Sequence, residues 1–245
     1  MRAAIIFLGL TLTLVGFADK DDFAMAREKL MAEIQQDMNR AGHMTGSYRL
    51  STDVRAALLA VRREEFVPFG VRTLAYHNRP LPIGEGQTIS QPFIVALMTE
   101  LMAVDADDTV LEVGTGSGYQ AAVLAEIVRE VYTVEIVPEL ARSAEERLRN
   151  LGYTNVRVLT GDGTLGWPDA APFDAIMVTA AGLRIPEALK QQLKPGGTMV
   201  MPVGAQGETQ YLTVVRRQAD GSFTEARNLP VRFVPITGDN DAAGG

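Results

Sequence analysis

Short apolar runs alternate with amphipathic stretches along the second half of the chain. Five of these runs have the length and the near-continuous apolar character of strands that are covered on both faces. They are residues 110–113, 131–136, 156–159, 175–179 and 198–202. Between them, apolar residues recur at helical spacing in residues 119–128, 138–151 and 185–193. Strands that alternate with helices predict a parallel, doubly wound sheet.

Two further apolar runs, 211–216 and 232–236, flank a turn at Gly221 with no clear helix between them. They predict an antiparallel pair that closes the sheet. The expected fold class is therefore α/β. It is a doubly wound, mostly parallel, seven-stranded sheet of the Rossmann-like kind with an antiparallel C-terminal strand and an N-terminal helical extension.

The first half of the chain predicts helices rather than strands. Apolar residues recur at helical spacing in three stretches, residues 24–41, 52–63 and 93–102. In the first stretch, four apolar residues lie on or near one face: Met25, Leu30, Ile34 and Met38. Prolines break the pattern before residues 84–92, which we expect to form a loop. We expect a single domain over residues 19–245, with the helices and this loop in 19–103 and the sheet in 104–245.

The first eighteen residues differ from the rest of the chain. Arg2 is followed by an uncharged, mostly apolar stretch that ends at Ala18, and Asp19 begins a charged segment. This pattern is typical of a secretory signal peptide, and it is short for a membrane-spanning helix, which needs about 20 apolar residues. It predicts export to the periplasm or tethering to a membrane. An uncleaved anchor, or a true start at Met25, remain the alternatives.

Composition narrows the possible functions. The chain has 245 residues and a formal net charge of −7, with no basic stretch of the kind that binds nucleic acid, so we expect no nucleic-acid partner. The pairs Arg62-Arg63 and Arg216-Arg217 are expected to be solvated. With no cysteine and only two isolated histidines, His43 and His77, we also expect no metal site and no thiol nucleophile.

The most informative motif follows the first predicted strand. Gly114, Gly116 and Gly118 alternate with other residues directly after residues 110–113 and directly before a predicted helix. Glycines allow a sharp turn and let a ligand lie against the main chain, and free N–H groups at a helix start favour an anionic group. The motif predicts a site for a nucleotide-type cofactor.

The spacing of acidic residues distinguishes between two cofactors. Gly116 and Gly118, with Ala121, satisfy a loose dinucleotide fingerprint, so a nicotinamide-dependent oxidoreductase is one hypothesis. Three acids favour S-adenosyl-L-methionine instead: Glu112 within the first strand, Glu135 at the end of the second and Asp162 after the third. All three fall at or near the carboxyl ends of strands, where open α/β sheets bind ligands, and Glu135 is placed to accept from ribose hydroxyls.

Several segments together resemble one enzyme family. They are PLPIGEGQTISQP at 80–92, VLEVGTGSGYQAAVLA at 110–125, VYTVEI at 131–136, GDG at 161–163, APFDAIMVTAA at 171–181, LKPGG at 193–197 and VRFVPI at 231–236. The chain is similar to bacterial protein-L-isoaspartate O-methyltransferases, which are class I S-adenosylmethionine-dependent methyltransferases, over residues 50–237. The glycine loop is generic to methyltransferases, whereas GQTISQP narrows the family.

The resemblance implies a function and a set of site residues. Members transfer a methyl group from S-adenosyl-L-methionine to the α-carboxylate of L-isoaspartyl residues in damaged proteins, which begins their repair to L-aspartyl, and they are cytoplasmic by default. It implies an active-site role for Ser90, with Thr88 and Ile89 shaping the substrate pocket and Arg232 as a substrate or sheet-edge residue. The implied cofactor residues are Glu112, Gly114, Gly116, Ser117, Gly118, Glu135, Asp162, Gly163 and Thr237.

The chemistry of the acceptor agrees with this composition. A carboxyl group with an unperturbed pKa near 3.3–3.9 is ionised at neutral pH and needs no strong base. The remaining alternatives are a methyltransferase with another acceptor, a nicotinamide-dependent oxidoreductase and a binding module without activity. We expect isoaspartyl proteins and peptides as partners, and a monomer.

Overall fold

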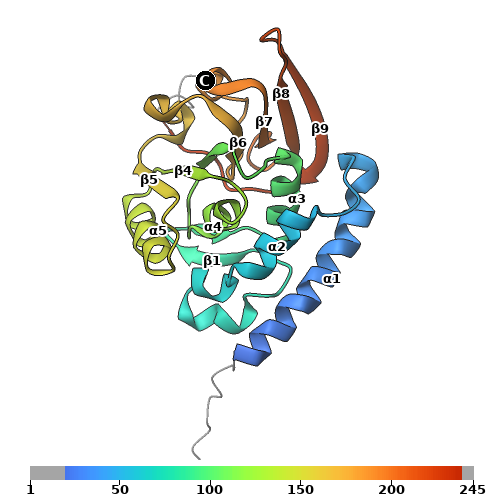
Figure 1. The fold of residues 1–245 in the computed structure, drawn as a ribbon, viewed down its shortest axis with the longest axis vertical. Coiled ribbons are helices and arrows are strands. Elements are labelled where there is room, and N and C mark those ends of the chain that lie inside the picture. The colour runs from blue at the N-terminus through green and yellow to red at the C-terminus, as the bar shows by residue number, and fades with distance from the viewer. Residues whose placement is uncertain (1–19, 239–245) are drawn as a thin grey trace, which may run out of the picture.

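The computed structural model describes residues 20–238, and it contains the predicted sheet (Figure 1). Seven strands lie in the order β5-β4-β3-β6-β7-β8-β9. Their bounds are β3 Thr109–Val113, β4 Glu130–Glu135, β5 Val156–Thr160, β6 Phe173–Val178, β7 Leu193–Val203, β8 Gln210–Arg217 and β9 Phe223–Val231. The first five are parallel to one another, whereas β8 pairs antiparallel with both β7 and β9. The predicted fold class is confirmed.

Helices cover both faces of this sheet. They are α1 Lys20–Thr45, α2 Thr52–Ala60, α3 Pro92–Met102, α4 Tyr119–Ala125, α5 Pro138–Asn150 and α6 Glu187–Gln191. Successive side chains of a strand point to opposite faces, and Val110 and Leu111 of β3 accordingly belong to two different apolar clusters. All five residues of β3 are buried, which explains why its sequence is nearly continuous in apolar residues.

The predicted last strand at 232–236 is wrong. The chain pairs through β9 instead, where Ala226 lies opposite Val214 of β8, and residues 232–236 contribute only an isolated bridge from Pro235 to Ala181. Most of β9 is exposed because it is the edge of the sheet, so its sequence lacks the apolar pattern that marks a strand. The structure also begins β7 at Leu193, earlier than the predicted 198, and shortens the preceding helix to α6.

The N-terminal helices form one wall of the molecule. In Figure 1, α1 runs along one side, and it packs against α2, α3 and β9. Leu30, Ile34 and Met38 are buried as predicted, but Met25 is 68% exposed. The expected loop at 84–92 contains part of a hairpin, β1 Leu81–Gly84 and β2 Gln87–Ile89.

The expectation that both arginine pairs are solvated holds for only part of each pair. Arg62 and Arg216 are exposed and Arg217 is partly buried, but Arg63 is completely buried. The prediction was wrong for Arg63 because the pair Arg62-Arg63 falls near the end of a helix, where charged residues usually face water. His43 and His77 are both exposed.

The predicted signal segment, residues 1–18, lies outside the described residues. Within residues 20–238, no helix is both long and apolar enough to cross a membrane. In the same part of the chain, no group of three acidic or histidine side chains is arranged to hold a metal ion.

Candidate active site

The glycine loop lies where the strand order reverses. It follows β3, which has β4 on one side and β6 on the other, so the two neighbouring crossovers leave a crevice at its carboxyl end. Gly114 has a φ of 97°, and a Cβ there would lie 2.3 Å from Oγ1 of Thr179. Only glycine satisfies both conditions, because other residues are strained at this φ and the threonine leaves no room.

Glu135 holds the loop from the end of β4. The backbone N–H of Gly116 donates to its Oε2 at 2.8 Å, and the N–H of Val137 donates to its Oε1 at 3.0 Å. On the other side, Nη1 of Arg147 in α5 donates to the carbonyl of Ser117 at 2.8 Å. These bonds fix the loop between two elements, and each carboxylate oxygen of Glu135 keeps a lone pair for a further donor.

Glu112 is a completely buried acid beneath the loop. Its Oε2 accepts from the hydroxyl of Thr133 at 2.6 Å, and that hydroxyl also lies 2.6 Å from Oγ1 of Thr115. Its Oε1 has no partner among the described residues. Burial raises the pKa of Glu112 to about 8, and the nearby Glu135 carboxylate adds to the rise, whereas the Thr133 bond opposes it. An unpartnered buried oxygen of this kind suits a cationic group of a ligand.

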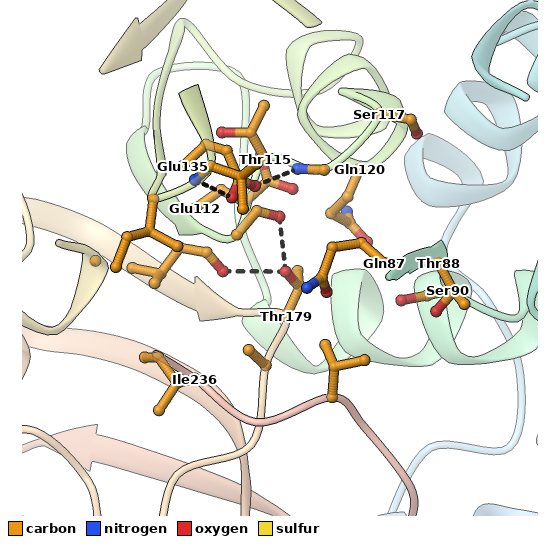
Figure 2. Close-up of a pocket in the computed structure, with 18 of the residues that line it drawn as sticks. Gln87, Thr88, Ser90, Glu112, Thr115, Ser117, Gln120, Glu135, Thr179 and Ile236 are labelled. Carbon is orange, nitrogen blue, oxygen red and sulfur yellow. Dashed lines mark hydrogen bonds between the residues drawn. The ribbon is translucent and has the colours of Figure 1, made fainter. Parts of the chain in front are cut away.

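These residues surround one cavity, the glycine-loop cavity (Figure 2). Of the predicted site residues, ten line it: Thr88, Ile89, Ser90, Glu112, Gly114, Gly116, Ser117, Glu135, Gly163 and Thr237. Figure 2 shows Thr88 and Ser90 on one side and Glu112 and Glu135 on the other, with Thr179 between them. The sequence reasoning therefore identified residues from widely separated segments that share one cavity.

Three predicted residues lie elsewhere. Gly118 is the N-cap of α4, with a φ of 85°, and shapes the loop from outside the cavity. Asp162 is beside the cavity, where its Oδ1 accepts from the N–H and the hydroxyl of Thr164 at 2.8 and 2.7 Å. Arg232 is exposed in a neighbouring groove.

That neighbouring groove, the α1 groove, runs between α1 and the C-terminal segment. Asp37, Arg40 and Met44 of α1 line one side, and residues 206–210 and 229–234 line another, while Ser90, Thr179 and neighbouring residues complete the wall. Four residues belong to the walls of both cavities: Thr88, Ser90, Thr179 and Val234. A ligand in the glycine-loop cavity and a second molecule in the α1 groove would therefore meet at Ser90 and Thr179.

Sequence reasoning missed Thr179. Its hydroxyl lies 2.7 Å from the carbonyl of Gly114 and 3.0 Å from that of Val113, so it ties the end of β6 to the glycine loop. The available signal was its place as the last residue of the predicted strand 175–179, since side chains at the carboxyl ends of parallel strands face the ligand site.

The hairpin of β1 and β2 forms one wall of the glycine-loop cavity. Ile83 of β1 packs against the loop, 3.3 Å from the position that a Cβ on Gly116 would take. Ser90 follows β2, and its hydroxyl makes no hydrogen bond to any residue within 20–238, so it is free to donate to a bound ligand. The described walls of the two cavities contain no His, Cys or Lys.

A mostly parallel sheet with a glycine loop at its switch point, a carboxylate at the end of the next strand and an adjoining second groove is the arrangement of a class I methyltransferase. The family profile described as "Protein-L-isoaspartate(D-aspartate) O-methyltransferase (PCMT)" matches residues 35–241. The chain belongs to this protein-L-isoaspartate(D-aspartate) O-methyltransferase family. The match confirms the resemblance predicted from the GQTISQP and glycine-loop segments.

Curated relatives support the same family. Protein-L-isoaspartate O-methyltransferase 2 of Syntrophobacter fumaroxidans is 54% identical over 224 residues, which are 91% of this chain and 90% of the relative. Protein-L-isoaspartate O-methyltransferase of Gloeobacter violaceus is 58% identical over 184 residues, which are 75% of this chain and 89% of the relative.

Solved structures agree on the fold. One described as a protein-L-isoaspartate O-methyltransferase superposes with a TM-score of 0.75 at 29% identity, and the match covers 87% of this chain and 66% of that chain. A Plasmodium falciparum β-aspartate methyltransferase in complex with S-adenosyl-L-homocysteine gives a TM-score of 0.69 at 23% identity, over 84% of this chain and 98% of that chain. The second match shows a shared fold.

Proposed function

We propose that this chain transfers a methyl group from S-adenosyl-L-methionine to the α-carboxylate of L-isoaspartyl residues in damaged proteins, which initiates their repair. The observation that carries the proposal is the shared wall of the two cavities, because methyl transfer needs a donor and an acceptor that meet at one point. Membership of the family and relatives that are more than 50% identical support the same reaction.

The glycine-loop cavity fits the cofactor. When bound, S-adenosyl-L-methionine supplies a methyl group that an acceptor carboxylate takes directly, without proton transfer. The unpartnered Oε1 of Glu112 is suited to the ammonium group of the methionine part, alongside Gly114, Gly116 and Ser117. Glu135 is placed for the ribose hydroxyls, and Gly163 with Asp162 for the adenine. We keep Thr237, an exposed residue of the cavity wall, as a further cofactor contact.

Ser90 is the residue that we assign to the acceptor. Its free hydroxyl can donate to the acceptor carboxylate where the two cavities join, while Thr88 and the buried Ile89 shape the pocket around it. The carboxylate is already ionised at neutral pH, so its methylation needs no base to remove a proton. Catalysis then depends on alignment and exclusion of water, and alignment alone can contribute on the order of 7–11 kcal/mol. Arg232, exposed in the α1 groove, is placed to attract an acidic substrate.

A peptide pair tests this function. Purified protein, given S-adenosyl-L-methionine with a labelled methyl group, is expected to label an isoaspartyl peptide and to ignore the matching aspartyl peptide. Equal labelling of both peptides, or labelling of neither with cofactor demonstrably bound, refutes the substrate assignment. A thermal shift with S-adenosyl-L-homocysteine, but none with a reduced nicotinamide cofactor, separates this proposal from the oxidoreductase hypothesis.

Four further properties are proposed from the sequence. We propose a monomer that binds no nucleic acid, in line with the net charge of −7. We keep residues 19–245 as one domain and residues 1–18 as an export signal or membrane tether rather than part of the catalytic domain. Sequencing the N-terminus of the mature protein after cell fractionation tests the last of these, because a first residue at or near Asp19 in an exported fraction supports cleavage.

A further inference from the structure

Arg63 is a completely buried arginine directly behind the proposed active site. It begins a short 3-10 turn, Arg63–Phe66, that follows α2. Its Nε donates to the carbonyl of Ala75 at 2.9 Å, and its Nη2 donates to the carbonyl of Ser90 at 2.7 Å. Its guanidinium carbon lies 4.8 Å from the centre of the Tyr119 ring, and its Nη1 has no partner among the described residues.

This buried charge is held by carbonyls and an aromatic ring rather than by a carboxylate. The adjacent acid, Glu64, is occupied elsewhere, because it accepts from the hydroxyl of Tyr76 and lies 3.8 Å from Nη2 of Arg27. Burial lowers the pKa of Arg63, as expected for a cation removed from water. An apolar side chain of similar volume would satisfy core packing better, since a buried charge without a partner ion is unfavourable.

The contacts of Arg63 connect the acceptor side of the site with the cofactor loop. Ser90 lies between β2 and α3 on the acceptor side, and Tyr119 is the first residue of α4, directly after the glycine loop. Both residues line the glycine-loop cavity. Arg63 therefore bridges, through one rigid planar group, the segment that carries the proposed catalytic hydroxyl and the helix that follows the cofactor loop.

We propose that Arg63 is a positioning residue for methyl transfer: through the Ser90 carbonyl it fixes the Ser90 hydroxyl relative to the glycine loop, and its charge favours an anionic acceptor at that wall. This inference rests on the proposed function of Ser90. Arg63 acts on the acceptor side, so its loss changes turnover and the KM for the peptide more than the affinity for the cofactor.

Two substitutions test this role, one that keeps the positive charge and one that removes it. Arg63→Lys keeps the charge but loses the planar fork, whereas Arg63→Gln keeps a neutral donor. The matched control is Arg27→Lys. Arg27 is another arginine of this region, and it is partly buried. Its Nη1 donates to the carbonyl of Leu59 at 2.6 Å and its guanidinium carbon lies 5.4 Å from the centre of the Tyr76 ring, but it lines neither cavity.

We expect each Arg63 variant to lower kcat with an isoaspartyl peptide at least tenfold, assayed well below its melting temperature, with the Kd of S-adenosyl-L-homocysteine changed less than threefold. Arg27→Lys is expected to lower the melting temperature and leave kcat within threefold of wild type. Because Arg63 acts through Ser90, the double variant Arg63→Lys/Ser90→Ala should be no slower than Ser90→Ala.

The inference is overturned if a folded Arg63 variant turns over like wild type, if cofactor affinity and kcat fall together, or if the double variant loses the product of both single effects. Wild-type protein in the same assay distinguishes a failure of the Arg63 inference from a failure of the proposed methyltransferase function. Wild-type protein that labels no isoaspartyl peptide defeats both, whereas normal wild-type turnover beside an equally active Arg63→Lys variant defeats the positioning role alone.

Discussion

Replacing Glu112 by glutamine should stabilise the protein without its cofactor and weaken cofactor binding. Glu112 is completely buried, with Oε1 unpartnered, and burial raises its pKa to about 8. In the unfolded chain the same carboxyl has an ordinary pKa near 4.5. Between these two values the unfolded state loses the proton while the folded state keeps it, so stability falls as the pH rises.

The size of the effect follows from proton linkage. The stability penalty grows by about 1.4 kcal/mol per pH unit across this window, which reaches roughly 4 kcal/mol near pH 8. Glutamine carries no such penalty, but its buried NH2 group would place two N–H donors without partners where the wild type has the single unpartnered Oε1, which costs about 1–3 kcal/mol more. At pH 8 the free energy of unfolding of the variant should therefore be about 1–3 kcal/mol higher than that of the wild type. Near pH 5 this stability difference should disappear or reverse.

Urea unfolding of both proteins at pH 5 and pH 8, without cofactor, measures this difference. Calorimetry with S-adenosyl-L-homocysteine measures the other side, where loss of a charge-assisted hydrogen bond of about 1.5–3 kcal/mol predicts a Kd raised roughly 10- to 150-fold. Glu145→Gln, at an exposed position of α5, is the control and should change neither quantity. A stability difference that is independent of pH, or an unchanged Kd, contradicts the assignment of Glu112.

Four further changes separate the parts of the site. Ser90→Ala should lower kcat by a larger factor than it raises the Kd of S-adenosyl-L-homocysteine. Glu135→Ala removes the hydrogen bonds to the glycine loop and should raise this Kd by a larger factor than it lowers kcat. An equal loss of cofactor binding in both variants overturns this division of roles. Gly163→Ala places a Cβ 2.3 Å from Cγ1 of Val113 and should lower the melting temperature, with partial rescue by Val113→Ala. Arg232→Gln should raise the KM for an acidic peptide and leave the cofactor Kd unchanged.

The parts of the site that local spacing determines were predictable. The glycine loop after β3 and the acid at the end of β4 follow from residue types at fixed offsets along the chain, and both line the cavity. β9 was not predictable by periodicity, because an edge strand that is mostly exposed needs no apolar face. Its location depends on pairing with β8, which no local pattern reports.

Arg63 illustrates a different limit. Two consecutive arginines at the end of a helix are typical of a solvated surface, and Arg62 is indeed exposed. Whether Arg63 enters the core depends on two carbonyl groups at Ala75 and Ser90, 12 and 27 residues further along the chain. Only the folded chain brings these acceptors together, so its burial, and the role that follows from it, required the three-dimensional structure.

The most direct measurement is a crystal structure of the protein with S-adenosyl-L-homocysteine and an isoaspartyl peptide. We expect the homocysteine part beside Glu112 and the glycine loop, the peptide in the α1 groove, and the peptide α-carboxylate hydrogen-bonded to the Ser90 hydroxyl. A carboxylate oxygen should lie within about 3–3.5 Å of the place where the methyl group would stand. A peptide carboxylate bound away from Ser90, or a glycine-loop cavity filled by neither part of the cofactor, would contradict this expectation.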